Sequence, residues 1–377
     1  MVGCGKVGSE IVRDLSRANE IDSVTATDAS RESLARVKKW PKVETVRTDL
    51  SQRKTLVRLM NAADIVCGAL PGRLGFEMLQ EAVQQGCDIV DISYTPKDPF
   101  TLHASAVAGN CVLVPQCGVA PGLTNLCVGD AFRRLETVRA VRILVGGLPQ
   151  KPVPPLNYRV VFSLEDVVNE YTRPVHVIER GRRKMVEPLS GRGFLNFPNV
   201  GRLEYFLTDG LGTLPRSFPR VREMHELTLR YPGHAEMMNV LRTLGYFNQR
   251  RVRVDGGEVE PRMLSIELLR SAFGVGAPED LLAFLVEVEG RLGGKRVLLR
   301  YQMLDWFDRK NGVSAMARTT AYPCTSTALL VGRKRVPWKG VVTPEKIGQD
   351  PRLFGFILSR LRARGLRLTI QMRNLGS

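Results

Sequence analysis

The chain has 377 residues, of which 44% are hydrophobic, and a formal net charge of +17 at pH 7. This length accommodates two domains with hydrophobic cores, whereas no stretch reaches the roughly 18 apolar residues of a membrane span and no signal peptide is recognisable. We therefore expect a cytoplasmic protein with no membrane partner, and we interpret the scattered lysines and arginines as a solvated basic surface rather than as a nucleic-acid-binding one.

The first predicted feature along the chain is a dinucleotide-binding fingerprint, GxGxxG, at residues 3–8. The first glycine of such a motif allows a tight turn, the second lets the backbone approach a pyrophosphate, and the third lets helix and strand pack closely. Residues 7–15 then place apolar side chains at helical spacing. A strand normally precedes the motif, but only Met1 and Val2 do so here. Either the Rossmann fold is unusual or its first strand is truncated, and we expect the natural protein to begin several residues upstream.

Strand and helix patterns alternate over the first third of the chain. Alternation at this spacing indicates βαβ units and a parallel sheet. We therefore predict a doubly wound Rossmann domain of the α/β class. The predicted strands are residues 23–27, 43–47, 64–70, 88–92 and 111–115, and the predicted helices are residues 31–39, 52–61 and 76–85.

The pattern changes after about residue 126, where predicted strands follow one another without regular crossover helices. They cover residues 140–146, 226–230, 251–254 and 296–302, and an amphipathic helix is predicted around residues 354–361. Consecutive strands without crossovers favour a mixed or antiparallel sheet. We predict that this region forms a second, α+β domain.

Asp28 lies 20 residues after Gly8, at the end of the strand predicted at residues 23–27. A carboxylate there accepts hydrogen bonds from the ribose hydroxyls of a dinucleotide and repels a 2′-phosphate, so NAD is the predicted cofactor. The nearby Arg31 could pair with a 2′-phosphate, which keeps NADP open. The residues predicted to bind the cofactor are Gly3, Gly5, Lys6, Val7, Gly8, Asp28, Ala69, Leu70 and Pro71.

Three longer motifs are far more specific than the glycine fingerprint. They are PQCGVAPGLTN at residues 115–125, LRYPGH at residues 229–234 and AMARTTAYP at residues 315–323. With these motifs the chain resembles the saccharopine dehydrogenase family in its broad sense. The segments VGGLP at residues 145–149 and EYTRP at residues 170–174 are similar to the L-lysine 6-dehydrogenase branch of that family.

The resemblance implies a Rossmann domain that is interrupted by a catalytic domain. On this basis we expect residues 1–125 to form the NAD(P)-binding domain, residues 126–325 to form a catalytic and dimerisation domain, and residues 326–377 to return to the Rossmann domain. The resemblance also implies a homodimeric enzyme that uses NAD(P) to oxidise a carbon–nitrogen bond of an amino acid.

Two residues are predicted to be catalytic, because amine oxidation needs a base and a fixed substrate orientation. Asp91 ends a predicted strand at the edge where open α/β sheets bind ligands, so it is expected to recognise an ammonium group or relay a proton. Capping of the following turn is the alternative role for Asp91. His234 follows a Pro-Gly turn and has a side chain that titrates near neutral pH. The residues alone do not decide which of the two moves the proton.

Five further residues are predicted to bind the substrate: Tyr94, Thr124, Arg230, Arg318 and Thr319. Arg230 and Arg318 can each hold a carboxylate through two hydrogen bonds, or they can serve instead as surface ion-pair partners. Thr124 lies in a turn that opens a helix, where backbone N–H groups could hold an anion. The seven cysteines show no spacing typical of metal ligands, so no metal site is predicted.

These features support three functional hypotheses. The first is oxidative deamination of the lysine side-chain amine by an NAD-dependent enzyme, which gives a semialdehyde that cyclises. The second is a saccharopine-type dehydrogenase, whose substrate carries an additional dicarboxylate end and needs more cationic groups. The third is a catalytically silent nucleotide-binding protein, which only the short N-terminus supports.

Overall fold

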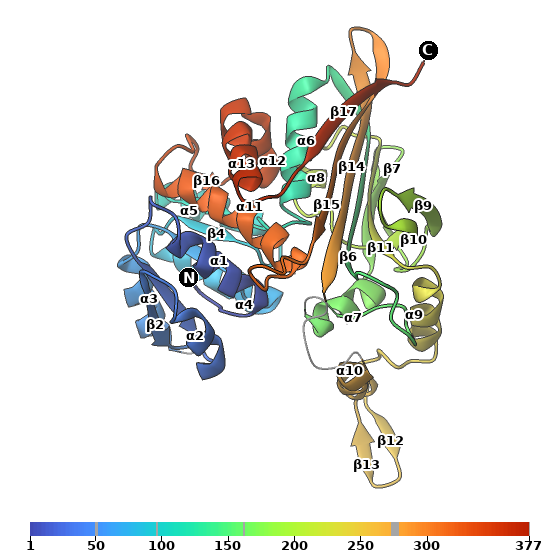
Figure 1. Ribbon diagram of the computed structural model, residues 1–377, viewed down its shortest axis with the longest axis horizontal. Coiled ribbons are helices and arrows are strands. Elements are labelled where there is room, and N and C mark those ends of the chain that lie inside the picture. The colour runs from blue at the N-terminus through green and yellow to red at the C-terminus, as the bar shows by residue number, and fades with distance from the viewer. Residues whose placement is uncertain (50–51, 96, 161–162, 273–278, 377) are drawn as a thin grey trace.

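The computed structural model describes residues 1–49, 52–95, 97–160, 163–272 and 279–376. The described chain forms two layered parts, one built on parallel strands and one on a mixed sheet (Figure 1). No helix within these ranges is both long enough and apolar enough to cross a membrane.

The parallel strands form two groups that a single residue joins. Their bounds are β1 (Val24–Asp28), β2 (Val43–Arg47), β3 (Val66–Gly68), β4 (Ile89–Asp91), β5 (Val112–Val114) and β16 (Gly340–Val341). One group runs in the order β16-β5-β4-β3 and the other is the pair β1-β2. Val2 makes parallel bridges to Gly68 in β3 and to Thr27 in β1. The strand order is therefore that of a Rossmann sheet in which Val2 occupies the place of the first strand.

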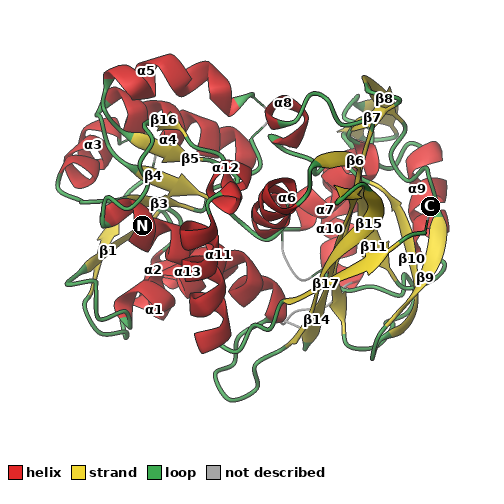
Figure 2. Ribbon diagram, turned by 90° about the horizontal axis from the view of Figure 1, so that it is seen from above, coloured by secondary structure: helices red, strands yellow, loops and turns green. Residues whose placement is uncertain are grey.

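Helices cover both faces of these strands, as the doubly wound prediction requires (Figure 2). Their bounds are α1 (Lys6–Ser16), α2 (Arg31–Val37), α3 (Arg53–Asn61), α4 (Gly72–Gln84), α5 (His103–Ala108) and α11 (Ala315–Gly332), with a 3-10 turn at Pro99–Leu102. Alternate residues of a strand point to opposite faces. Ile89 and Leu113 accordingly pack in a core cluster with α3, α4 and α5, whereas Val90 and Val112 pack in a cluster with α1 and α11.

The second part is built on a nine-stranded mixed sheet, which confirms the predicted second domain type. Its main path is β17 (Thr369–Asn374), β15 (Lys295–Trp306), β14 (Asp280–Leu292), β6 (Thr137–Pro149), β11 (Glu223–Arg230), β10 (Gly201–Leu207) and β9 (Gly193–Phe197). Off this path, β7 (Val175–Glu179) pairs with β11, and β8 (Arg182–Val186) pairs with β7. Strands β6 and β11 pair in parallel, and the other pairs described in this sheet are antiparallel.

Both faces of the mixed sheet are buried along much of its central strands β6, β14 and β11. The remaining helices are α6 (Leu123–Arg134), α7 (Leu164–Thr172), α8 (Leu214–Ser217), α9 (His234–Thr243), α10 (Pro261–Ala272), α12 (Pro344–Gln349) and α13 (Pro351–Ala363). Along β14, Leu282 and Phe284 belong to the core cluster that includes α6 and α11, whereas Leu281 and Ala283 belong to the cluster that includes α7 and α9. Residues 281–286 of this strand therefore form a continuous apolar run.

Two segments differ from the expected arrangement. The strand predicted at residues 251–254 is β12 (Val252–Val254), which pairs with β13 (Gly257–Val259) in a separate hairpin outside the mixed sheet. This hairpin projects from the body together with α10 (Figure 1). Within residues 326–377, β16 pairs with β5 of the Rossmann sheet, but β17 pairs with β15 of the mixed sheet. The proposed domain boundaries stay a prediction.

Candidate active site

The glycine fingerprint forms a turn whose shape depends on two of its glycines. Gly3 has φ +89°, and a Cβ atom there would lie 2.5 Å from the carbonyl oxygen of Ala69. A Cβ atom on Gly8 would lie 2.0 Å from the carbonyl oxygen of Gly3, whereas a Cβ atom on Gly5 would meet nothing within 4 Å. Gly5 therefore borders open space just before Lys6 begins α1. This arrangement fits a pyrophosphate that approaches the backbone at the helix N-terminus.

Asp28 holds this turn against the end of β1. Its carboxylate accepts hydrogen bonds from the backbone N–H of Cys4 (2.6 Å) and of Ser30 (2.7 Å). Each carboxylate oxygen has further lone pairs, so the group can still accept hydrogen bonds from ribose hydroxyls. Ala69 donates its N–H to Val2 (2.9 Å), and Pro71 precedes the first residue of α4. The residues predicted to hold the cofactor thus lie along one edge of the parallel strands.

Asp91 is fully buried at the end of β4. It accepts hydrogen bonds from the Ser93 hydroxyl (2.9 Å) and the Ser93 N–H (3.1 Å). Burial raises the pKa of Asp91 to about 7, although the bonds from Ser93 act in the opposite direction. A Cβ atom on Gly68 would lie 2.4 Å from the Asp91 carboxylate, so the strand beside it leaves no room for a larger residue. In this position Asp91 fixes the loop that carries Tyr94.

Tyr94 connects the Rossmann part to the mixed-sheet part. Its hydroxyl donates a hydrogen bond to Asp209 (2.9 Å), and Asp209 also bonds the ring Nδ1 of His176 (3.0 Å). The guanidinium of Arg173 lies 5.1 Å from the centroid of the Tyr94 ring. Burial, followed by the negative charge of Asp209, raises the pKa of Tyr94, and the charge of Glu226 contributes in the same direction. We call Tyr94, Arg173, His176, Asp209 and Glu226 the interdomain cluster.

Glu226 is the most deeply buried acid of the interdomain cluster, with 5% of its surface exposed. It lies on β11 and accepts a short hydrogen bond from the Thr208 hydroxyl. Burial raises the pKa of Glu226 to about 8, and the negative charges of Glu170 and Asp209 act in the same direction. This carboxyl group is therefore partly ionised near neutral pH, which suits a group that exchanges a proton.

His234 and Arg230 lie in the core of the mixed-sheet part. Arg230 is 1% exposed, forms an ion pair with Glu170 (2.6 Å) and lies 4.4 Å from the centroid of the Tyr158 ring.

His234 is fully buried and makes two hydrogen bonds. Its Nδ1 donates to the carbonyl of Leu156 (2.8 Å), and Nε2 of the neutral ring therefore accepts from the Tyr171 hydroxyl (2.7 Å).

Burial, together with the positive charge of Arg230, lowers the pKa of His234 to about 3. A neutral buried imidazole with two hydrogen bonds has a positioning role in this geometry. Within the described residues, no hydrogen bond or ion pair joins His234 to Asp91, and the catalytic roles of both remain predictions.

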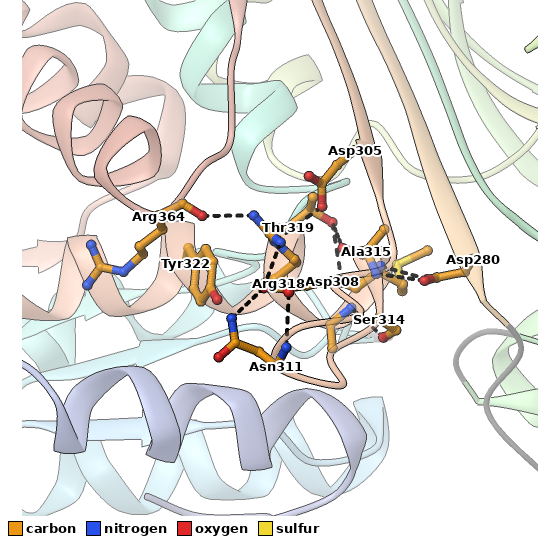
Figure 3. A network of polar contacts seen from close by, with 12 residues as sticks. Asp280, Asp305, Asp308, Asn311, Ser314, Ala315, Arg318, Thr319, Tyr322 and Arg364 are labelled. Carbon is orange, nitrogen blue, oxygen red and sulfur yellow. Dashed lines mark hydrogen bonds and ion pairs between the residues drawn. The ribbon is translucent and has the colours of Figure 1, made fainter. Parts of the chain in front are cut away.

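Arg318 belongs to a network of ion pairs at the start of α11 (Figure 3). Its guanidinium lies 3.3 Å from Asp305 and 3.3 Å from Asp308, and it donates a hydrogen bond to the carbonyl of Arg364 (2.8 Å). The hydroxyl of Thr319 donates to the carbonyl of Ala315 (2.7 Å) within the same helix. Both side chains thus have partners within the chain, and the substrate contacts of Arg318 and Thr319 stay a prediction.

Thr124 has a similar internal partner, because its hydroxyl donates to the side-chain oxygen of Asn125 (3.0 Å) and the residue is fully buried. The sequence reasoning missed Arg173, Asp209 and Glu226. For Glu226 a signal existed, because an acid stands in the otherwise buried second half of β11. Arg173 lies in the EYTRP segment at residues 170–174 that carries part of the family resemblance, although no role was predicted for it. Asp209 stands in a polar segment where nothing local distinguishes it.

Comparison with known proteins gives matches over nearly the whole chain. The family model described as the saccharopine dehydrogenase NADP binding domain matches residues 1–114, and the one described as the saccharopine dehydrogenase C-terminal domain matches residues 118–366. The first match confirms the predicted NAD(P)-binding domain.

Individual relatives are distant. An alpha-aminoadipic semialdehyde synthase from Rattus norvegicus mitochondria is 22% identical over 97% of this chain, and the match covers 47% of that protein. The chain thus spans about half the length of this curated relative. A carboxyaminopropylagmatine dehydrogenase from Synechocystis sp. is 22% identical over 69% of each protein.

A solved structure shows the same fold. The apo histidine-tagged saccharopine dehydrogenase (L-Glu forming) from Saccharomyces cerevisiae superimposes with a TM-score of 0.80, at 15% identity, over 99% of this chain and 98% of that one. The similarity confirms the predicted fold class, a Rossmann sheet combined with a mixed-sheet domain.

Proposed function

This chain belongs to the saccharopine dehydrogenase family, and from that premise we propose that it is an NAD(P)-dependent oxidoreductase acting on the CH–NH2 group of an amino acid. The proposed substrate is L-lysine, whose side-chain amine is oxidised to an imine. Water hydrolyses the imine to ammonia and the semialdehyde, which then cyclises onto the α-amine. We include in this proposal the homodimer that the family resemblance implies.

The observation that supports this substrate most directly is the charge pattern of the interdomain cluster. Lysine carries one carboxylate and two ammonium groups. Arg173 is half-buried and contacts the Tyr94 ring, but within the described residues no ion pair neutralises it. Asp209 supplies negative charge beside it, and Glu226 adds to this charge in its ionised form. An arginine that binds the carboxylate and acids that bind an ammonium group together match an amino acid with a basic side chain.

A saccharopine-type substrate is supported less well by the same residues. Its additional dicarboxylate end requires further cations, but Arg230 already pairs with Glu170, and Arg318 already pairs with Asp305 and Asp308. These bonds would have to be exchanged for bonds to the substrate. The catalytically silent alternative has no support from the glycine turn, whose geometry fits a dinucleotide.

The chemistry requires that the reacting amine is neutral when its carbon loses a hydride. We propose that Glu226 takes the proton from the substrate ammonium, because a carboxyl group with a pKa of about 8 exchanges protons near neutral pH. The bound nicotinamide supplies the hydride acceptor. Asp91 positions the Tyr94 loop through Ser93, and His234 positions Tyr171.

The experiment that tests this proposal combines a substrate panel with removal of the Arg173 guanidinium. Purified protein is incubated with NAD or NADP and with L-lysine, saccharopine or 1,5-diaminopentane, which is lysine without its carboxylate. We expect cofactor reduction with lysine. Arg173→Ala should raise the KM for lysine roughly 10-fold to 100-fold, as expected for a lost charge-assisted hydrogen bond, and should leave the weaker reaction of diaminopentane unchanged.

Arg202→Ala is the matched control, because Arg202 also lies over an aromatic ring, that of Phe194 (4.2 Å), outside the interdomain cluster. An equal loss with lysine and diaminopentane in Arg173→Ala would rule out a carboxylate contact. Activity with saccharopine but not lysine would support the saccharopine-type alternative, and no reduction with any amine would favour the silent protein.

A further inference from the structure

Exposed apolar side chains are frequent in the segment from the end of α9 to α10. The hairpin of β12 and β13 and the helix α10 within this segment project from the mixed-sheet part (Figure 1). Of the fourteen large hydrophobic residues that are exposed in the described chain, eight fall between residues 240 and 268. We call these eight the arm surface: Val240, Leu244, Tyr246, Val252, Val254, Met263, Leu264 and Leu268. Monomeric proteins in water rarely gather so many apolar side chains in one exposed region.

The helix α10 is apolar on two sides. On the inner side, Ile266 is 2% exposed and packs in the core with Leu269. On the outer side, Leu264 and Leu268 are one turn apart and are 49% and 55% exposed, beside Met263. A surface helix ordinarily turns a polar face to water, so the outer face of α10 has the character of a contact surface.

The hairpin of β12 and β13 also lacks a cover. The residues of β12 are all exposed, and β12 pairs only with β13 among the described strands. A two-stranded hairpin is at best marginally stable in water by itself. Packing of Val252 and Val254 against another apolar surface would therefore stabilise it.

The charges around the arm surface indicate which partner fits. Arg251 lines a shallow groove beside Met263 and Leu264 together with acids of the same segment, Glu258, Glu260 and Glu267. A polyanion such as nucleic acid would be repelled by these acids. A twofold contact uses the same patch on both subunits, so the patch must complement itself. Basic and acidic residues that border one apolar centre meet this requirement.

We propose that the arm surface is the interface through which two copies of this chain form a homodimer. The outer face of α10 in one copy packs against the hairpin of the other, and the arginines beside β12 face the glutamates that line the groove. The arm surface is thus the proposed interface of the homodimer that is part of the proposed function. The test of this interface does not depend on the proposed lysine oxidation, because the mass of the assembly is measured without turnover.

The test measures mass in solution by sedimentation and light scattering over a range of protein concentrations. Wild type should have twice the mass of the 42.0-kDa chain. The double variant Leu264→Lys and Leu268→Lys should raise the dissociation constant roughly 100-fold or more, because each substitution acts in both subunits of a twofold contact. Its circular dichroism and thermal midpoint should show that each chain remains folded, since both side chains are exposed.

Met185→Lys is the matched control, because Met185 is 69% exposed on β8, outside the arm surface. This variant should dimerise as wild type does. A folded double variant that remains dimeric would overturn the proposal, as would a wild-type protein that is monomeric at all concentrations. Loss of the dimer in Met185→Lys would place the interface elsewhere.

Discussion

Arg173 differs from the other candidate arginines in what surrounds its guanidinium. Arg230 and Arg318 are 1% and 8% exposed, and each already pairs with carboxylates of the chain. Removal of such a partner leaves a buried acid unpaired and destabilises the fold. Arg173 is half-buried beside Tyr94 and can reach a ligand without giving up an ion pair. The sequence therefore predicted that an arginine binds the substrate carboxylate, but it did not predict which arginine does so. Whether an arginine is already ion-paired depends on acidic residues far away in the chain.

His234 gives a prediction for stability against pH. Its folded-state pKa is lowered to about 3 from 6.5, so the contribution of the neutral ring is fully present above pH 6.5. It is lost as the pH falls from 6.5 towards 3, because the unfolded chain takes up a proton that the folded chain resists. His234→Gln cannot ionise. The stability of wild type relative to this variant should fall by about 2 to 3 kcal/mol between pH 7 and pH 4.5, measured by urea unfolding.

His234→Phe serves as the control for this measurement, since it also cannot ionise but lacks the hydrogen bonds. Both variants should show the same change relative to wild type between the two pH values, although their stabilities at pH 7 differ. A difference from wild type that does not vary with pH would mean that His234 is solvated in the folded protein.

At the scale of elements, Asp280 shows how β14 fixes the start of α11. The fully buried carboxylate accepts hydrogen bonds from the N–H groups of Ala315 (2.7 Å) and Met316 (2.9 Å), two of the donors that a helix leaves unpaired at its N-terminus (Figure 3). Asp280→Ala should lower the free energy of unfolding by about 2 to 4 kcal/mol, because both donors lose their partner in a buried site. Chemical denaturation measures this change.

Asp280→Asn is the isosteric control and keeps one acceptor oxygen. The free energy of unfolding should fall clearly less in Asp280→Asn than in Asp280→Ala. The two N–H groups bond different carboxylate oxygens, and the NH2 group of Asn cannot accept a hydrogen bond. Equal losses in the two variants would therefore show that one accepted hydrogen bond is not enough and that the start of α11 needs both carboxylate oxygens.

The elements differ in how far the sequence predicts them. Strands β1 to β5 of the Rossmann part were predicted because each is a β-branched or apolar run between helical patterns. The two-residue strand β16 was not predicted. The helix α11 was not predicted, since it is buried on nearly all sides and so has no polar face to give a helical period. Pro323 in its interior also argues locally against a helix. Tertiary packing, rather than local preference, determines this helix.

At the scale of the whole molecule, the candidate site forms only when the two parts come together. The glycine turn and Asp28 could be predicted because their spacing is local. Tyr94 and Asp209 are 115 residues apart in the chain, and their hydrogen bond joins the loop after β4 to the segment after β10. No periodicity or motif encodes such a pair. The substrate is proposed to bind at this junction, so its binding should depend on the coupling between the two parts.

A double-mutant cycle on Tyr94→Phe and Asp209→Asn measures that coupling. Each single variant should lower kcat/KM for lysine, and the double variant should be hardly worse than either, with a coupling of roughly 1.5 to 3 kcal/mol for a hydrogen bond to a charged group. Cofactor affinity, measured by fluorescence titration, should remain unchanged because neither residue belongs to the glycine turn.

Asp98 and Arg216 form the matched control pair, since their ion pair spans 118 residues but is half exposed on both sides. The coupling energy of this control pair should be within about 1 kcal/mol of zero. Additive losses from Tyr94→Phe and Asp209→Asn would show that the two side chains act on the substrate separately.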